Sequence, residues 1–429
     1  MKVLVVGASG LIGSAICARL HERGMEVMRV IRPGSASGTN GIGEAVEIDL
    51  ARAVRPEDWM PHLSGVAAVV NCAGTLQDGP GEDTSAVHLR GPSALFQACE
   101  QKGVSRVIHF SAMGVEKEQP SSFSRTKFEG DKALMARDLD WVILRPSVVL
   151  GPGAFGASAL FRGVAALPVL PLMPNTGMLQ VVRLEEVVRT VEILLGPNAP
   201  ARLVLEVAGP EALSFQDVVS AYRRWLGWGA ARAVKVSPAV AAVLYKLSDL
   251  AGALGWRPPT RSTAQKEIVR GAVGDIRPWV EVTGIQPSAL SEALARTPVS
   301  VQERWFAKLY LLKPVVFGVL SLFWISTGVV SLTIGYDIGV DLMLRTGAGS
   351  LARPSVVAGA IADIVIGVAI AFRRTSRIGL YGAVGLSLFY AIAGTILLPE
   401  LWSEPLGPLM KIWPIIVLHL AALAIIEER

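Results

Sequence analysis

The chain has 429 residues, enough for two or three domains, and its mean hydropathy of +0.46 is too high for a purely soluble enzyme. The apolar excess lies after residue 314, so we expect a membrane part and contact with the lipid bilayer. The net charge of +5 is modest and the basic residues are scattered, which excludes a nucleic-acid binder and favours a basic face toward anionic lipid.

The first segment, MKVLVVGASGLIG, joins a short apolar run to a glycine-rich turn. The run predicts a buried parallel strand, and apolar residues at helical spacing predict a helix after the turn. Gly7, Gly10 and Gly13 have the spacing that a sharp turn, a close approach to a pyrophosphate and tight helix packing require. Unpaired N–H groups at the helix start also suit phosphate charge. We therefore expect a dinucleotide site rather than an ordinary glycine-rich turn.

The next expected strand, residues 26–31, is followed by Arg32 and lacks the carboxylate that an NAD site places on the ribose 2′-hydroxyl. Arg32 suits a 2′-phosphate, although a solvated arginine at a strand end is the plain alternative. The sequence favours NADP(H) over NAD(H) as the cofactor.

Four more strands are expected at residues 45–50, 66–74, 104–111 and 140–150, with a helix over 87–103. Alternating strands and helices predict an α/β fold, a Rossmann-type doubly wound parallel sheet. Ligands bind such sheets at the carboxyl ends of the strands, where the small pair Ala73 and Gly74 lets the backbone pass close to a cofactor.

Three cysteines, Cys17, Cys72 and Cys99, fall in expected helix or strand without metal-ligand spacing. We interpret them as core residues of a reducing compartment and expect no metal site. The first strand already occupies the N-terminus, so we expect no signal peptide and a cytoplasmic position for this part.

The chain is divided into a dinucleotide-binding domain over 1–154, a small cap with completing elements over 155–300 and an all-α membrane domain over 301–429. Within the cap, a helix begins near Leu184, and Ser214 followed by Asp217 predicts a helix N-cap. The segments WLGWGA and GWRPPTRST are rich in tryptophan, proline or arginine; they lie either at a membrane interface or in packed loops.

The motifs GASGLIG, NCAG, FSAMG, SRTKFEGDKAL and LRPSVVLGPG follow one another in an order that resembles the short-chain dehydrogenase/reductase superfamily. The chain is most similar to its atypical branch, with NmrA-like proteins and the NADPH-binding accessory subunit of complex I. The resemblance assigns Ser111 as the active-site serine, Lys127 to the nicotinamide ribose and Pro146 to the carboxamide. It places the following residues against the cofactor: Gly7, Ser9, Gly10, Leu11, Ile12, Arg32, Asp49, Leu50, Ala73 and Gly74.

One position departs from the family signature Y-x-x-x-K: counting back from Lys127 gives Phe123, which has no hydroxyl. The first tyrosine in the chain is Tyr222, so none from the dinucleotide-binding domain can substitute. Loss of a positioned proton donor typically costs about 10²- to 10⁴-fold in rate. Ordinary alcohol and ketone chemistry is therefore in doubt.

Three interpretations of this departure stay open. Another group donates the proton, with Ser111, Lys127 and His88 as candidates. Alternatively, the acceptor is conjugated or quinone-like, and its reduced form depends less on a positioned proton donor. Alternatively, the site holds NADPH without turnover. His88 is more simply a histidine on a helix surface, and His109 is expected in the core.

Four apolar segments follow an amphipathic stretch over 301–313, at about 314–334, 354–372, 378–398 and 412–426. The last is short for a membrane span. The basic loop RRTSR, residues 373–377, predicts that this loop, the dinucleotide domain and the C-terminus face the cytoplasm of a multi-pass inner-membrane protein. This part resembles the DoxX-like four-helix membrane family.

Two ionisable residues, Asp363 and His419, fall near the middle of expected spans. Such residues usually face a partner inside the bundle. We expect a polar pair, which either handles protons or a quinone-like head group or only fixes helix order.

Together these features favour a membrane-anchored NAD(P)H-dependent oxidoreductase that reduces a small hydrophobic or quinone-like acceptor. The alternatives are a non-catalytic NADPH-binding sensor or assembly protein, and an epimerase or dehydratase of nucleotide-linked sugars. The sequence leaves oligomerisation open.

Overall fold

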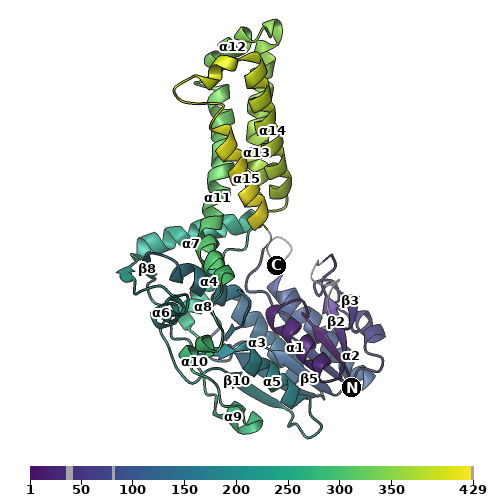
Figure 1. The fold of residues 1–429 in the computed structure, drawn as a ribbon. Helices are drawn as coiled ribbons and strands as arrows, with labels where there is room; N and C mark the ends of the chain where they lie inside the picture. Colours follow the sequence, from purple (N-terminus) through teal and green to yellow (C-terminus); the bar gives the residue numbers. More distant parts are fainter. Residues whose placement is uncertain (35–41, 80–82, 427–429) are drawn as a thin grey trace. The chain divides into compact units, whose positions relative to one another are not determined.

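A computed structural model describes residues 1–34, 42–79 and 83–426 of the chain (Figure 1). These residues form two compact units. The first unit contains Met1–Asp249 and Pro258–Ala307; the second contains Leu250–Arg257 and the chain from Lys308 onward. The short segment Leu250–Arg257 is therefore part of the helical second unit although it interrupts the first in sequence.

The first unit is built on a seven-stranded parallel sheet with the strand order β10-β6-β5-β4-β1-β2-β3. The order reverses between β1 and β4, as in a doubly wound fold, and confirms the predicted sheet. The strands are β1 (Lys2–Val6), β2 (Glu26–Ile31), β3 (Glu44–Glu47), β4 (Ala68–Asn71), β5 (Arg106–Phe110), β6 (Asp140–Pro146) and β10 (Leu203–Val207).

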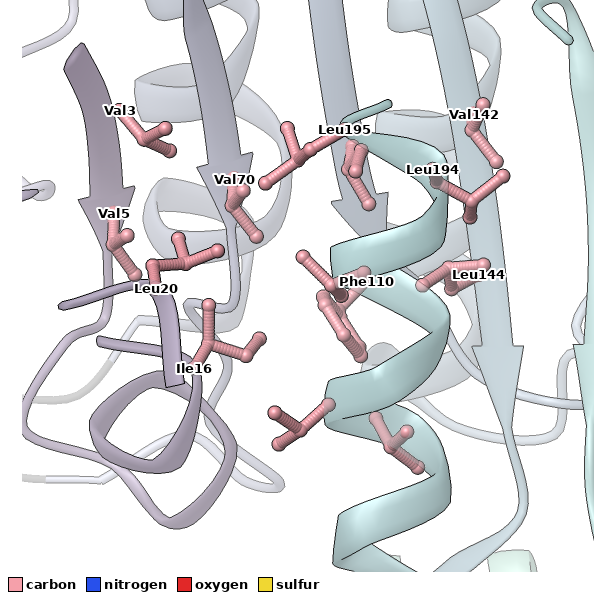
Figure 2. Close-up of a cluster of buried hydrophobic side chains, with 14 of the residues drawn as sticks. Val3, Val5, Ile16, Leu20, Val70, Phe110, Val142, Leu144, Leu194 and Leu195 are labelled. Carbon is pink, nitrogen blue, oxygen red and sulfur yellow. The ribbon is translucent and has the colours of Figure 1, made fainter. Parts of the chain in front are cut away.

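Successive side chains of β1 enter different cores on the two faces of the sheet. Val3 and Val5 pack with α1 (Leu11–Glu22) and α5 (Leu184–Leu194), and Figure 2 shows this cluster between α5 and the strands. Leu4 and Val6 pack in the cluster that includes α2 (Gly91–Lys102) and α3 (Ser122–Met135). Because both faces are covered, the strands are apolar throughout.

Two predicted elements are divided in the structure. The strand expected over 140–150 ends at Pro146, and β7 (Val148–Leu150) pairs instead with β9 (Val181–Arg183) in a separate small sheet. The helix expected over 87–103 begins with a π-helical turn, Ala86–Arg90, before α2. Pro92 lacks the N–H that a regular α-helix would use there, which favours the wider turn.

The remaining elements of the first unit include several helices that the sequence pattern did not indicate. The Ser214 cap is confirmed, since its side chain accepts a hydrogen bond from the Asp217 N–H at the start of α6. The elements are α4 (Gly156–Ala165), β8 (Val169–Leu172), α6 (Phe215–Trp225), β11 (Arg232–Lys235), α7 (Pro238–Ala253), α8 (Ser262–Arg270), α9 (Arg277–Thr283) and α10 (Leu290–Ala295).

The second unit is a helical bundle whose long helices lie side by side in Figure 1. Three segments are long and apolar enough to cross a membrane, Val301–Leu332, Gly349–Ala371 and Ser376–Leu397, and they contain α11 (Val301–Leu332), α13 (Ala352–Ala371) and α14 (Ser376–Leu397). The fourth apolar helix, α15 (Ile412–Ile425), is shorter, and α12 (Tyr336–Arg345) was not predicted.

Helix α11 begins near residue 301, well before the expected residue 314, because the amphipathic stretch continues directly into the apolar one. Glycines allow α11 and α13 to approach closely. A Cβ at Gly328 would lie 2.4 Å from the Ala360 carbonyl oxygen, and one at Gly367 would lie 2.8 Å from the Ser321 carbonyl oxygen. Small residues at these positions permit this backbone contact.

Candidate functional site

The glycine-rich turn connects β1 to α1 at the point where the strand order reverses. Gly7 has φ of +76°, and a Cβ there would lie 2.8 Å from the Ala73 nitrogen. A Cβ at Gly13 would lie 2.3 Å from the Gly7 carbonyl oxygen. Both positions therefore require glycine, for conformation at Gly7 and for space at Gly13.

Gly10 is the N-cap of α1 and provides no side-chain hydrogen bond to the first turn of the helix. Gly10 is exposed, whereas Leu11 and Ile12 pack against the core beneath it, and Ser9 is partly buried. The first amides of α1 are thus available to an anionic group. This cradle fits the pyrophosphate of a dinucleotide.

Arg32 lies at the carboxyl end of β2, in an open depression that also borders Asp49 and Arg52. The Asp49 carboxylate accepts a hydrogen bond from the Ala51 N–H and lies 3.6 Å from the Arg52 guanidinium. Leu50 follows it, and its carbonyl oxygen would lie 2.7 Å from a Cβ at Gly91. The depression therefore combines basic side chains with three carboxylates, those of Glu47, Asp49 and Asp58.

The loop after β4 is fixed by Asn71, whose side-chain oxygen accepts from the Ala73 N–H at 3.1 Å. Its amide nitrogen lies 3.1 Å from Nδ1 of His109, which therefore acts as the acceptor. Ala73 is buried and Gly74 is exposed, so the backbone reaches the protein surface at Gly74. Asn71, which lies in the motif NCAG, was not singled out from the sequence; an amide side chain at the end of an apolar strand is the signal that could have indicated its role.

Lys127 on α3 is buried at this loop, with 4% of its surface exposed. Its ammonium donates to the Phe110 carbonyl oxygen at 2.7 Å and to the Ala73 carbonyl oxygen at 3.1 Å. A Cβ on Gly74 would lie 3.5 Å from Nζ, so the ammonium is next to the exposed backbone of Gly74. Burial lowers the pKa of Lys127 to about 8, although the nearby Asp131 carboxylate opposes this change.

His88 is fully buried and is not the surface histidine that the sequence suggested. Its Nε2 accepts from the Thr75 N–H at 3.1 Å, which leaves Nδ1 to donate to the Thr126 hydroxyl at 2.8 Å. Burial, with Lys127 nearby, holds the pKa of His88 well below its ordinary value. Both ring nitrogens of His88 therefore already have hydrogen-bond partners within the protein.

Phe123 lies one helical turn before Lys127, with its ring in an edge-to-face contact with His88 at 5.5 Å between centroids. Tyr222, the first tyrosine in the chain, lies on α6, where it is buried beside Phe161 and Trp225. The position of the family tyrosine is therefore filled by an apolar ring.

Ser111 directly follows β5 and is buried near Lys127 and Asp131. Its hydroxyl lowers the pKa of Asp131, but within the described residues it meets no group at full hydrogen-bond geometry. Pro146 is partly buried at the end of β6, beside β5 in the sheet. Ser111 and Pro146 thus lie at the carboxyl ends of the neighbouring strands β5 and β6, and Lys127 of α3 reaches the Phe110 carbonyl oxygen at the end of β5.

A buried charge network lies behind Lys127 and was missed in the sequence. Arg145 on β6 donates to the Asp131 carboxylate at 3.0 and 3.2 Å and to Glu116 at 2.6 Å. Burial raises the pKa of Asp131, while Ser111 and Arg145 oppose the rise. Two signals were available: Asp131 lies four residues after Lys127, and Arg145 is a charge within an apolar strand.

His109 is fully buried, as expected. Its Nε2 lies 3.7 Å from an Asp131 oxygen, but burial holds the pKa of His109 well below its ordinary value. The two side chains therefore form no ion pair between full charges. His109 serves mainly to hold Asn71.

In the second unit, the expected pair of Asp363 and His419 is not formed. The Tyr390 hydroxyl donates to Asp363 at 3.1 Å. His419 accepts from the Trp324 indole N–H at 2.9 Å and donates through Nδ1 to the Ile415 carbonyl oxygen at 2.6 Å. The prediction of a direct pair is wrong. Asp363 bonds to Tyr390 of α14, whereas His419 bonds to Trp324 of α11 and to the backbone of its own helix.

Two family descriptions match the chain in separate regions. Residues 7–157 match the NAD(P)H-binding family, which covers the glycine turn, Ser111, Lys127 and Pro146. Residues 321–420 match the DoxX-like family, which covers most of the helical second unit.

Among curated relatives, a ceramide reductase of Caulobacter vibrioides is 25% identical over 186 residues, 43% of this chain and 57% of the relative. The photosystem II assembly factor Ycf39 of Cyanophora paradoxa is 24% identical over 147 residues, 34% of this chain and 44% of that protein. The matched part of the chain thus spans about half the length of these relatives.

Among solved structures, MoeE5 in complex with UDP-glucuronic acid and NAD superimposes with a TM-score of 0.53 and 22% identity over 69% of this chain and 97% of that one. This likeness concerns the fold alone. The chain therefore combines an N-terminal region similar to the NAD(P)H-binding family with a C-terminal region similar to the DoxX-like family, which contains apolar helices.

Proposed function

We propose that the protein is a membrane-anchored, NAD(P)H-dependent reductase of a hydrophobic or quinone-like acceptor. The observation that carries the proposal is Lys127, a buried ammonium held by two backbone carbonyls beside the exposed Gly74, with a pKa of about 8. Burying an ammonium in this position has a high desolvation cost. Groups whose pKa is shifted in this way concentrate at functional sites.

The cofactor would be held by the glycine turn, the open N-terminus of α1 and the loop Ala73–Gly74, with Lys127 at the nicotinamide ribose and Pro146 at the carboxamide. When bound, the dinucleotide supplies a hydride. The chain must then supply the proton that the reduced acceptor takes up. Ser111 and Lys127 are the two groups placed to do so, because His88 is neutral and fully engaged.

Arg32 would contact the 2′-phosphate of NADP(H) in the depression at the end of β2, with Asp49 and Leu50 toward the adenine. We expect Arg32→Ala to weaken NADPH binding by about 1.5–3 kcal/mol and to leave NADH binding nearly unchanged. Fluorescence titration of both cofactors measures this. Equal loss for both cofactors would contradict the preference for NADP(H).

The acceptor class is proposed from two features. The relative from Caulobacter is by name a reductase of ceramide, a lipid. In this chain, a DoxX-like helical domain with three segments apolar enough to span a membrane is joined to the cofactor domain. The basic loop at residues 373–377 favours a cytoplasmic position for the cofactor domain and the C-terminus.

The test is NAD(P)H oxidation by detergent-purified protein with a water-soluble quinone and with a long-chain ketone. We expect turnover with at least one acceptor and a loss of about 10²-fold or more in Lys127→Ala. Lys132→Ala is the matched control, since Lys132 lies exposed on the same helix. Turnover that is insensitive to Lys127→Ala would contradict the proposed site.

A second candidate function rests on Phe123. A site without the family hydroxyl fits a protein that binds NADPH as a sensor or assembly factor, and the similarity to Ycf39, by name an assembly factor, agrees with this. Tight NADPH binding without oxidation across both acceptor classes would favour it. The epimerase alternative has weaker support, because the likeness to the UDP-sugar protein extends to the fold alone.

A further inference from the structure

Helix α7 presents an uncovered apolar face. Val240, Val243, Leu244, Leu247 and Leu250 recur at helical spacing, and each is between 46% and 59% exposed. Such a stripe on a soluble helix normally faces the core. Contiguous exposed apolar surface of this kind marks a place where a protein meets another apolar surface.

The opposite face of α7 is the one that packs on the protein. Ala241 and Tyr245 are buried there, and the Ser248 hydroxyl lies 2.8 Å from the hydroxyl of Thr260. Asp249 accepts from the Ser262 N–H at 3.0 Å and lies 3.7 Å from the Arg261 guanidinium. The helix is therefore fixed in rotation, with its aliphatic face outward.

The end of α7 continues into the segment Leu250–Arg257, which belongs to the helical unit. The Trp256 ring lies 4.7 Å from that of Phe317, and its indole N–H donates to the Ala371 carbonyl oxygen at 2.7 Å. The Arg373 N–H donates to the Leu254 carbonyl oxygen at 3.0 Å. Phe317 lies on α11, whereas Ala371 ends α13 and Arg373 lies in the basic loop after it, where this candidate span would leave the bilayer.

We propose that the lipid of the bilayer surface covers this face of α7, so that α7 is an interfacial helix. The continuity of α7 with a segment bound at the end of a candidate span favours lipid over a soluble partner. Charge agrees: Lys246 flanks the stripe, and the one acidic residue of α7, Asp249, is engaged on the opposite face. Apolar faces bordered by basic residues suit an anionic lipid surface.

The helix that follows α7 contacts the start of α3, the helix that carries Phe123 and Lys127. The Ser121 hydroxyl donates to the Glu267 carboxylate of α8 at 2.5 Å, just before Phe123. A Cβ at Gly114 would lie 3.2 Å from an Arg270 nitrogen, and Gln77 reaches the Pro258 carbonyl oxygen at 3.5 Å. The segment after α7 thus touches the loops that follow β4 and β5 and the start of α3.

This arrangement assigns a route to the acceptor: it passes from the lipid along α7 and α8 toward Lys127 on α3. The route rests on the proposed function, because it presumes an acceptor dissolved in the bilayer. The docking of α7 itself does not depend on turnover.

The first experiment tests docking without activity. Full-length Leu247→Cys and Ala242→Cys, each carrying an environment-sensitive fluorophore, are placed in nanodiscs of phosphatidylcholine and phosphatidylglycerol with nitroxide-labelled acyl chains. Ala242 is exposed on the same helix, away from the stripe. We expect at least roughly twofold more quenching at position 247 than at 242. Equal quenching, or ready quenching of position 247 by aqueous iodide, would overturn the proposal.

The second experiment tests the route. Val243→Glu with Leu247→Glu should lower turnover of a bilayer-embedded quinone by roughly tenfold and leave that of a water-soluble quinone unchanged; Ala242→Glu should change neither. Equal loss with both quinones would overturn the route. If no variant, including the parent, oxidises NADPH, the proposed function fails while the quenching result still decides the docking.

Discussion

Both units bury ionisable side chains, but they connect them differently. In the cofactor unit, Arg145 joins the Asp131 and Glu116 carboxylates into one connected group, and the Asp131 charge acts on the nearby Lys127. In the helical unit, Asp363 and His419 each meet a separate aromatic partner. A connected group of charges can set the protonation of its members, whereas isolated polar contacts mainly fix the positions of helices.

The largest effect should come from breaking the connected group. Arg145→Met leaves the buried Asp131 without its cation, and we expect the free energy of unfolding to fall by about 3–5 kcal/mol. Thermal unfolding of the detergent-purified protein measures this. Arg137→Met, which removes a half-exposed pair with Glu100, should cost at most about 1 kcal/mol. Similar losses of unfolding free energy in both variants would show that the buried network stabilises the protein no more than a surface ion pair does.

The next effect concerns the apolar ring in front of the network. Phe123→Tyr places a hydroxyl one turn before Lys127, and we expect the rate of ketone reduction to rise by roughly 10²-fold, since a proton donor is restored. Phe128→Tyr on the same helix is the control and should leave the rate unchanged. An unaltered rate in Phe123→Tyr would mean that the proton already has an efficient donor.

The pH dependence of turnover should report Lys127. Its pKa is lowered to about 8 by burial, so the charged form dominates below pH 8. If the ammonium is required, the rate is flat below about pH 8 and falls roughly tenfold per unit above it. Lys127→Arg stays charged throughout and should show no such fall in its residual activity. A rate that rises through pH 8 would instead assign the neutral amine as the active form.

The smallest effects are expected in the helical unit. Tyr390→Phe and His419→Ala should each destabilise the bundle by about 0.6 kcal/mol, the usual scale of a polar contact between membrane helices. Because the two contacts share no partner, the double variant should equal the sum of the single ones. A coupling energy above about 0.5 kcal/mol would instead indicate that the contacts of Asp363 and His419 interact with each other.

The sequence by itself determined the elements whose signal is local. The strand–glycine–helix unit at Gly7, the parallel sheet and the apolar segments follow from periodicity and from the conformations that glycine permits. Ser111 and Lys127 were assigned by the resemblance to a known family, and their roles stay predictions; the structure places Ser111 directly after β5 and Lys127 against the Phe110 carbonyl oxygen.

Only the tertiary structure decided which distant residues meet. It placed Arg145 of one strand on Asp131 of a helix, buried His88 between Thr75 and Thr126, and separated Asp363 from His419. It also rotated α7 so that its aliphatic face points outward, which helical periodicity alone would have assigned to the core. Hydrophobic patterns define faces but not their partners, and the partners depend on packing between elements far apart in sequence.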